Sequence, residues 1–93
     1  MDYIMNIKPV NKPGSHRQGT ICGLSAAQIQ EVLGFSANVK DDPYKVRYSW
    51  GFTVDGVQCG IWDYKGSHYF NSFSFYGPKE IMVSLFGTDY IKA

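Results

Sequence analysis

The sequence predicts an α+β fold: a small antiparallel sheet of three or four strands, centred on a β-hairpin over Tyr44–Lys65, with two short helices on one face. One observation is an Asp-Gly pair between β-branched and aromatic runs, which favours a two-residue hairpin turn. Another is a pair of segments with apolar residues at helical spacing, each followed by a glycine. The length of 93 residues fits a single domain covering residues 1–93.

The residues before the first helix predict a strand and a loop. Asp2–Val10 alternates weakly between apolar and polar side chains, so we expect a short strand there. Asn11–Thr20 is polar and rich in turn residues, and it has no apolar periodicity. We therefore expect this segment to be a loop.

The first helix is specified by its ends. Ser25 is the expected N-cap, because Gln28 three positions later completes a capping box. Gly34 suits the left-handed position that ends a helix. The expected buried stripe consists of Ile29, Val32 and Leu33. A loop over Ser36–Pro43 is expected to lead from this helix to the hairpin.

The hairpin is expected to turn at Asp55-Gly56, which fixes the register of its two strands. Its apolar face is expected to carry the pairs Val54/Val57, Phe52/Cys59, Trp50/Ile61 and Tyr48/Asp63. Its other face is expected to carry the pairs Thr53/Gln58, Gly51/Gly60, Ser49/Trp62 and Arg47/Tyr64. The first face has the composition of a core, and the second combines aromatic and cationic groups with a bare glycine pair.

A third strand and a second helix are expected after the hairpin. Ser72–Tyr76 alternates, with Phe73 and Phe75 facing inward. Gly77-Pro78 favours the start of a helix, and Gly87 favours its end. The expected buried residues of this helix are Ile81, Met82, Leu85 and Phe86.

The composition excludes several classes of protein. A net charge of +1 gives no electrostatic footprint for duplex nucleic acid. The chain has no apolar run long enough to cross a membrane and no secretory signal, so we expect a cytoplasmic protein with reduced cysteines. Aromatic residues make up 16% of the chain, more than one small core is expected to absorb. We therefore expect a homo-oligomer.

The groups that could carry catalysis are few and scattered. Cys22 and His16 would superficially suit a thiol nucleophile with its base, but no family signature surrounds them, and a structural cysteine beside a solvated histidine is the favoured interpretation. The carboxylates show no acid/base arrangement, and no metal-ligand spacing is present. The sequence therefore predicts neither an enzyme nor a cofactor or metal site.

Two clusters of polar and aromatic residues are candidates for ligand binding. The first is the loop over Asn11–Thr20, which offers cations, a hydroxyl and accessible backbone N–H groups to an anion. Its candidate residues are Lys12, Ser15, His16 and Arg17. A flexible surface connection is the alternative interpretation of this loop.

The second candidate is the outer face of the hairpin with the turn that follows it. Its residues are Arg47, Trp62, Tyr64, Ser67, His68 and Tyr69. We expect Arg47 to stack on Tyr64, and Trp62 to provide a flat floor beside the glycine pair. One alternative is that a helix or the N-terminal strand covers this face and makes Trp62 part of the core. Another is that the face mediates self-association.

Four short motifs occur in a recognisable order. They are a helix ending in Leu-Gly, an Asp-Asp-x-x-Lys-Val-x-x-x-Trp strand, an Ile-Trp-Asp-Tyr-Lys strand, and Tyr-Gly-Pro before a helix. This order resembles that of small proteins of unknown function encoded by tailed bacteriophages. The resemblance covers Thr20–Gly87 and departs after Lys65, where those proteins often have a longer insert. It implies a phage accessory protein, and many such proteins counter host defence.

These observations support two hypotheses. The first is a non-catalytic counter-defence protein that sequesters a small anionic, nucleotide-derived ligand through stacking and phosphate contacts. The second is a protein-binding inhibitor of a host defence complex, of the anti-CRISPR or anti-restriction type. The near-neutral charge argues against a DNA mimic within this second class.

Overall fold

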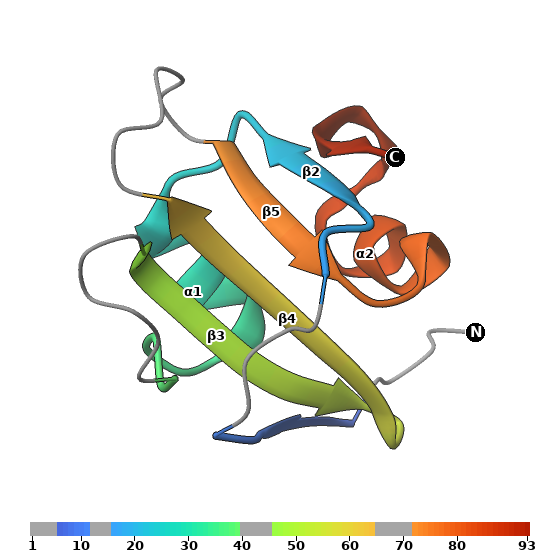
Figure 1. Cartoon of the computed structure of the whole chain (residues 1–93). Helices are drawn as coiled ribbons and strands as arrows, with labels where there is room; N and C mark the ends of the chain where they lie inside the picture. Colours follow the sequence, from blue (N-terminus) through green and yellow to red (C-terminus); the bar gives the residue numbers. More distant parts are fainter. Residues whose placement is uncertain (1–5, 12–15, 40–45, 65–71) are drawn as a thin grey trace.

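The computed structural model describes residues 6–11, 16–39, 46–64 and 72–93, which form an antiparallel sheet and two helices (Figure 1). The elements are β1 (Ile7–Pro9), β2 (Gly19–Cys22), α1 (Ala26–Leu33), β3 (Val46–Val54), β4 (Val57–Tyr64), β5 (Ser72–Tyr76), α2 (Lys79–Phe86), the 3-10 turn η1 (Thr88–Tyr90) and β6 (Ile91–Lys92). The strands lie in the order β1-β3-β4-β5-β2-β6. The α+β class is confirmed, but this six-stranded sheet is larger than the predicted three or four strands.

The hairpin of β3 and β4 has the predicted turn. Asp55 and Gly56 adopt positive φ angles of 51° and 84°, as a type I′ turn requires. The register from Val54/Val57 to Tyr48/Asp63 is confirmed. The predicted Arg47/Tyr64 pair is wrong, because a bulge shifts the register and Tyr64 pairs with Val46 instead. Arg47 is the extra residue of that bulge.

The strands β2 and β6 were not predicted from the sequence. β2 occupies the end of the expected Asn11–Thr20 loop and continues to Cys22, pairing with β5 on one side and β6 on the other. Four residues give too short a pattern to distinguish a strand from a loop, so these partners decide the conformation. At the other edge, β1 pairs with β3 and confirms part of the predicted N-terminal strand, whose residues 1–5 lie outside the described ranges.

Both helices begin and end close to the predicted positions. In α1, Ser25 and Gln28 form the predicted capping box, and Gly34 ends the helix at a φ of 88°. Ile29 and Leu33 are buried as predicted, but Val32 is 41% exposed, because it faces away from the sheet. In α2, Pro78 is the N-cap, and Gly87 follows the last turn. The buried residues of α2 are Met82 and Phe86, and Ile81 and Leu85 are half-buried.

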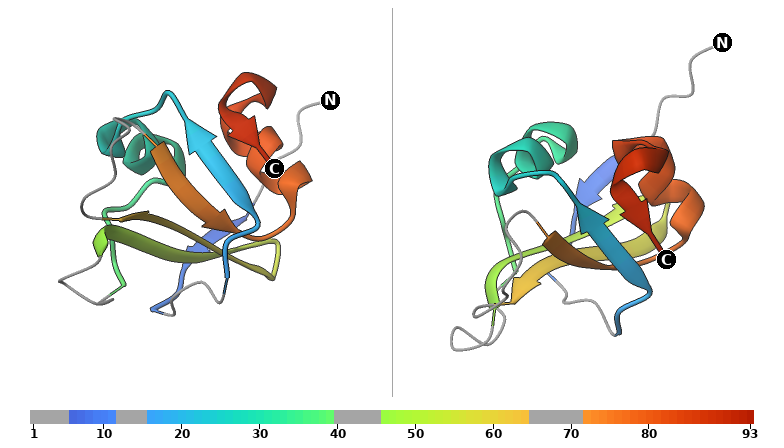
Figure 2. Two further views of the ribbon diagram at one scale, coloured as in Figure 1. Left: turned by 45° about the horizontal axis from the view of Figure 1, so that its top comes forward. Right: turned by 90° about the horizontal axis from the view of Figure 1, so that it is seen from above.

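The core lies between the helices and one face of the sheet, as the view from above shows (Figure 2). Alternate strand residues point to this helix-covered face, and most of them are buried, although Tyr48 and Val57 of the predicted apolar face are exposed. The buried ones include Trp50, Phe52, Cys59, Ile61, Phe75 and Ile21. The indole of Trp50 donates a hydrogen bond to the Phe35 carbonyl at 3.2 Å, which fixes the segment after α1 against the sheet. Burying each large side chain contributes about 1.5–3 kcal/mol.

The side chain of Asn38 joins the segment after α1 to β3. Its Nδ2 donates to the carbonyls of Val10 at 3.2 Å and Gly51 at 3.1 Å, and its Oδ1 accepts from the Gly51 N–H at 3.0 Å. The backbone of this segment also pairs with β3, since the N–H groups of Asn38 and Val39 both donate to the Ser49 carbonyl. The Asn38 amide therefore provides hydrogen-bonding partners for β3 beyond the end of β1.

Candidate functional site

The sheet has a second face that neither helix covers. The strand registers place thirteen residues on this helix-free face: Lys8, Thr20, Cys22, Ser49, Gly51, Thr53, Gln58, Gly60, Trp62, Ser72, Ser74, Tyr76 and Lys92. Most of them are hydroxyl, amide or glycine residues, and two are aromatic. Antiparallel sheets often leave one face polar and solvated, so this composition alone does not make a site. The positions of the aromatic and charged residues on this face are better evidence for a binding site than its overall composition.

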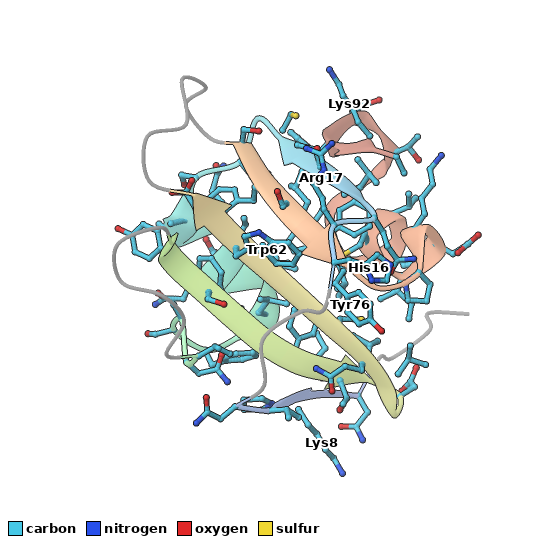
Figure 3. The ribbon with its side chains drawn as sticks, in the orientation of Figure 1. Lys8, His16, Arg17, Trp62, Tyr76 and Lys92 are labelled. Carbon is cyan, nitrogen blue, oxygen red and sulfur yellow. The ribbon has the colours of Figure 1, made fainter. Side chains whose placement is uncertain are left out.

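Trp62 lies near the middle of the helix-free face (Figure 3). It pairs across the sheet with Ser49 on β3 and Ser74 on β5, and both serines are buried. Trp62 itself is only 6% exposed, although both helices lie on the other side of the sheet. The alternative in which Trp62 is buried is therefore confirmed, although α1 and α2 lie on the other face and β1 extends the sheet edge, so none of these three elements covers it.

An aromatic pair, His16 and Tyr76, lies on the same side of the sheet as Trp62. The rings of His16 and Tyr76 meet edge to face, with centroids 5.3 Å apart and planes inclined at 72° (Figure 3). Tyr76 pairs across the sheet with Gly60, so the neighbouring position on β4 carries no side chain. The pair therefore places two aromatic rings next to a glycine position of β4, and Gly60 itself is buried.

The segment carrying His16 and Arg17 is held to β5 by Gln18. The Gln18 N–H donates to the Phe75 carbonyl at 2.8 Å, and Gln18 Oε1 accepts from the Gly77 N–H at 2.7 Å. Gly77 needs its glycine, because its φ is 127° and an added Cβ would lie 2.8 Å from the Cys59 Sγ. These contacts position the two predicted site residues at the end of β5.

The described charges are divided between the two sides of the sheet. The cations Lys8 and Lys92 lie on the helix-free face at opposite edges of the sheet, and Arg17 and His16 lie near β2 and β5 (Figure 3). Another described cation, Lys79, belongs to α2 on the other side. The described carboxylates lie elsewhere: Glu31 on α1, Glu80 on α2, Asp89 in η1, Asp55 in the hairpin turn and Asp63 on the helix-covered side of β4. Among the residues whose side chains are described, three of the four lysine and arginine residues thus lie on the helix-free side, and the strand registers place no side-chain carboxylate on that face.

The two cysteines are free and differ in environment. Cys59 is fully buried, and burial raises the pKa of its thiol from 9.0 to about 11. Cys22 is half-buried on the helix-free face, with its Sγ 4.0 Å from the Ser72 Oγ. It ends β2, whereas His16 precedes that strand, so the superficial thiol–imidazole pair is separated by the length of β2.

The structure places three of the predicted site residues, His16, Arg17 and Trp62, on the helix-free side of the sheet (Figure 3). The predicted residues Lys12, Ser15, Ser67, His68 and Tyr69 lie outside the described ranges. For Arg47 and Tyr64 only the backbone is described, and the bulge removes the direct pairing on which their predicted stacking depended. The sequence reasoning missed Tyr76, Gln18 and Lys92. The alternation of Ser72–Tyr76 does place Tyr76 on the face away from Phe75. Gln18 and Lys92 could be found only from the strands with which β2 and β6 pair.

Comparisons of the chain with protein-family models, curated proteins and solved structures found no match. Within the described part of the chain, no helix combines the length and apolar character required to span a membrane. The same residues contain no cluster of three histidine, cysteine or carboxylate side chains placed to hold a metal ion. The functional argument therefore depends on the geometry of the helix-free face.

Proposed function

We propose that the protein binds a small anionic, nucleotide-derived ligand on the helix-free face and releases it unchanged. The observation that carries the proposal is the coincidence of three kinds of group on one face. Cations accompany this face while the described carboxylates lie elsewhere, the His16–Tyr76 pair offers an aromatic surface, and serine and threonine hydroxyls lie between them. Phosphate oxygens, a base and a ribose require these three kinds of group.

Arg17 is the principal phosphate contact in this proposal. Its guanidinium is exposed and its backbone lies next to Gln18, whose two hydrogen bonds fix the segment. A guanidinium binds phosphate through two parallel N–H donors, and such charge-assisted hydrogen bonds contribute about 1.5–3 kcal/mol each. Holding the backbone in place reduces the entropy lost when the ligand binds.

Trp62 has a supporting role in this proposal. Only 6% of its surface is exposed, so the indole forms part of the floor, and the rings of His16 and Tyr76 offer the stacking surface. Substituting Trp62 by phenylalanine tests the floor more cleanly than truncation to alanine, because losing a buried tryptophan side chain costs about 3–5 kcal/mol of stability.

The resemblance to small proteins of tailed phages adds a biological setting to the proposal. In that setting the ligand is a nucleotide signal of a host defence system, and sequestration lowers its free concentration. Binding without turnover fits this role, since the one thiol of the helix-free face, Cys22, lies at the far end of β2 from His16. A protein-binding inhibitor acting through the same aromatic face is the alternative outcome of the test.

The proposal is tested by calorimetric titration of nucleotides into the wild-type protein and two matched variants. Arg17→Ala removes a cation beside the helix-free face, and Lys79→Ala removes an exposed cation from α2 on the other side. We expect Arg17→Ala to weaken binding by roughly 10- to 100-fold and Lys79→Ala to leave it unchanged. Equal losses in both variants, or no binding of any nucleotide to the wild type, would contradict the proposal.

A further inference from the structure

An accessible band of side chains crosses the helix-free face from one edge of the sheet to the other. It contains one residue from each strand, in the spatial order of the strands: Lys8, Thr53, Gln58, Tyr76, Thr20 and Lys92. The two lysines are exposed, and the other four residues are half-buried. A molecule on the surface can therefore contact every member of the band.

The band passes beside the buried centre of the same face. That centre consists of Ser49, Gly51, Gly60, Trp62 and Ser74, which offer little surface to a ligand. The band avoids them because Tyr76 is joined to its neighbours diagonally. Its direct partner on β4 is Gly60, and the band continues instead to Gln58, two residues away. On the other side, Thr20 pairs directly with Ser74, two residues from Tyr76. Such diagonal neighbours lie about 7–8 Å apart, within reach of long side chains.

Cations lie at both ends of the band, and aromatic rings lie between them. Figure 3 shows Lys8, Tyr76, His16, Arg17 and Lys92 following one another across the sheet. The exposed imidazole of His16 adds a second ring to that of Tyr76, and the exposed guanidinium of Arg17 adds a third cation. The band thus combines groups that bind phosphates with groups on which bases stack.

The length of the band indicates the size of its ligand. Neighbouring strands are about 4.8 Å apart, so the five steps from Lys8 to Lys92 cover about 24 Å. A mononucleotide is too short to contact both lysines. Successive nucleotides of a stacked strand lie about 3.4 Å apart, so about seven of them cover this distance, and an extended strand needs fewer. The band therefore matches a short oligonucleotide.

We infer that the ligand is a short single-stranded oligonucleotide that lies across the strands along this band. Its bases stack on the rings of His16 and Tyr76, and its phosphates lie near Lys8, Arg17 and Lys92. A single strand fits better than a duplex, because the bases of a duplex stack on each other and do not reach the two rings. This inference rests on the proposed function and specifies the class of its ligand.

The experiment titrates thymidine monophosphate and oligothymidylates of about two, four, eight and twelve nucleotides into the wild-type protein. We expect the affinity to rise with length up to about eight nucleotides and then to level off. Each phosphate contact of a single strand contributes about 0.7 to the salt dependence. With three contacts, the logarithm of the binding constant of the octamer should fall with the logarithm of the salt concentration with a slope of about −2.

Three matched variants locate the strand on the protein. Lys8→Gln and Lys92→Gln each remove a cation from one end of the band, and Lys79→Gln removes an exposed cation of α2, on the other side of the sheet. We expect each end variant to weaken octamer binding about three- to tenfold and to leave thymidine monophosphate binding unchanged. The salt slope should become shallower by about 0.7 in each. Lys79→Gln should match the wild type for every probe, and Lys8→Arg and Lys92→Arg should restore octamer binding.

The outcomes separate this inference from the proposed function. If no probe of any length binds the wild type, the proposed function itself fails. If thymidine monophosphate binds as tightly as the octamer, the proposed function stands and the oligonucleotide is the wrong ligand class. Equal binding of a duplex of the same length, or an equal loss in Lys79→Gln, would also overturn the inference. Thermal midpoints recorded for each variant identify any loss that comes from unfolding, and in that case the arginine variants decide the result.

Discussion

The contribution of the Asn38 amide to stability is the most quantitative prediction of the structure. Asn38→Ala removes three hydrogen bonds, two donated to the carbonyls of Val10 and Gly51 and one accepted from the Gly51 N–H. Each contributes about 1 kcal/mol net, so we expect a loss of about 2–4 kcal/mol in the free energy of unfolding. The Gly51 carbonyl keeps its bond from the Val10 N–H, which limits the loss to this range.

Urea unfolding followed by tryptophan fluorescence measures this loss, because Trp50 and Trp62 are both buried. The midpoint should fall while the m-value stays constant, and the melting temperature should drop by roughly 10–25 °C. Ser36→Ala, an exposed substitution in the same segment, should change the stability by no more than about 0.5 kcal/mol. If Asn38→Ala is as stable as this control, the amide does not hold the segment to β3 and the reasoning is refuted.

Three further perturbations follow from particular contacts. Gly56→Val should cost more than about 1 kcal/mol, because the turn holds this residue at a φ of 84°, and an unchanged melting midpoint would show that the turn is misassigned. Burial raises the Cys59 pKa to about 11, so the unfolded thiol ionises first as the pH rises and stability should fall by up to about 2–3 kcal/mol between pH 9 and 11. Cys59→Ala should show a smaller fall over that window, and identical pH profiles would contradict the assignment. Gln18→Leu removes the acceptor of the Gly77 N–H and should cost about 1–2 kcal/mol, whereas Gln18→Glu keeps the acceptor, so equal stabilities would exclude the contact.

The hairpin was predictable because its determinants are local. Asp55-Gly56 specifies the turn, and the strict alternation of side chains then places every residue back to Tyr48 on a face. The prediction failed one step further, at Arg47, where a bulge inserts an extra residue into β3. A bulge depends on how the strand bends within the whole sheet, and the sequence around Arg47 carries no signal for it.

The edge strands were not predictable for a different reason. β2 has four residues and β6 has two, and both are strands because β5 and β2 supply hydrogen-bonding partners far away in the sequence. Secondary structure of this kind is determined by tertiary pairing and not by local preference. The helices show the opposite case, since the capping box at Ser25 and the glycine at position 34 are local signals and were confirmed.

The candidate site was predictable only in part. The predicted register placed Trp62 on the outer face of the hairpin, which is confirmed, but the sequence left open whether a helix covers that face and whether Trp62 is buried. Tyr76 and Lys92 come from β5 and β6, so placing them on this face required the strand order. The net charge of +1 also concealed the cations of the helix-free side, because a sum over the chain does not show how charges divide between two sides.

The central claim is that the helix-free face binds the ligand, and mapping of amide chemical shifts during an ADP titration tests it most directly. The account predicts that the perturbed amides cluster at residues 16–20, 60–62, 74–76 and 91–92, while those of α1 shift little. Saturable shifts confined to α1 and α2, or no saturable shifts at all, would contradict it.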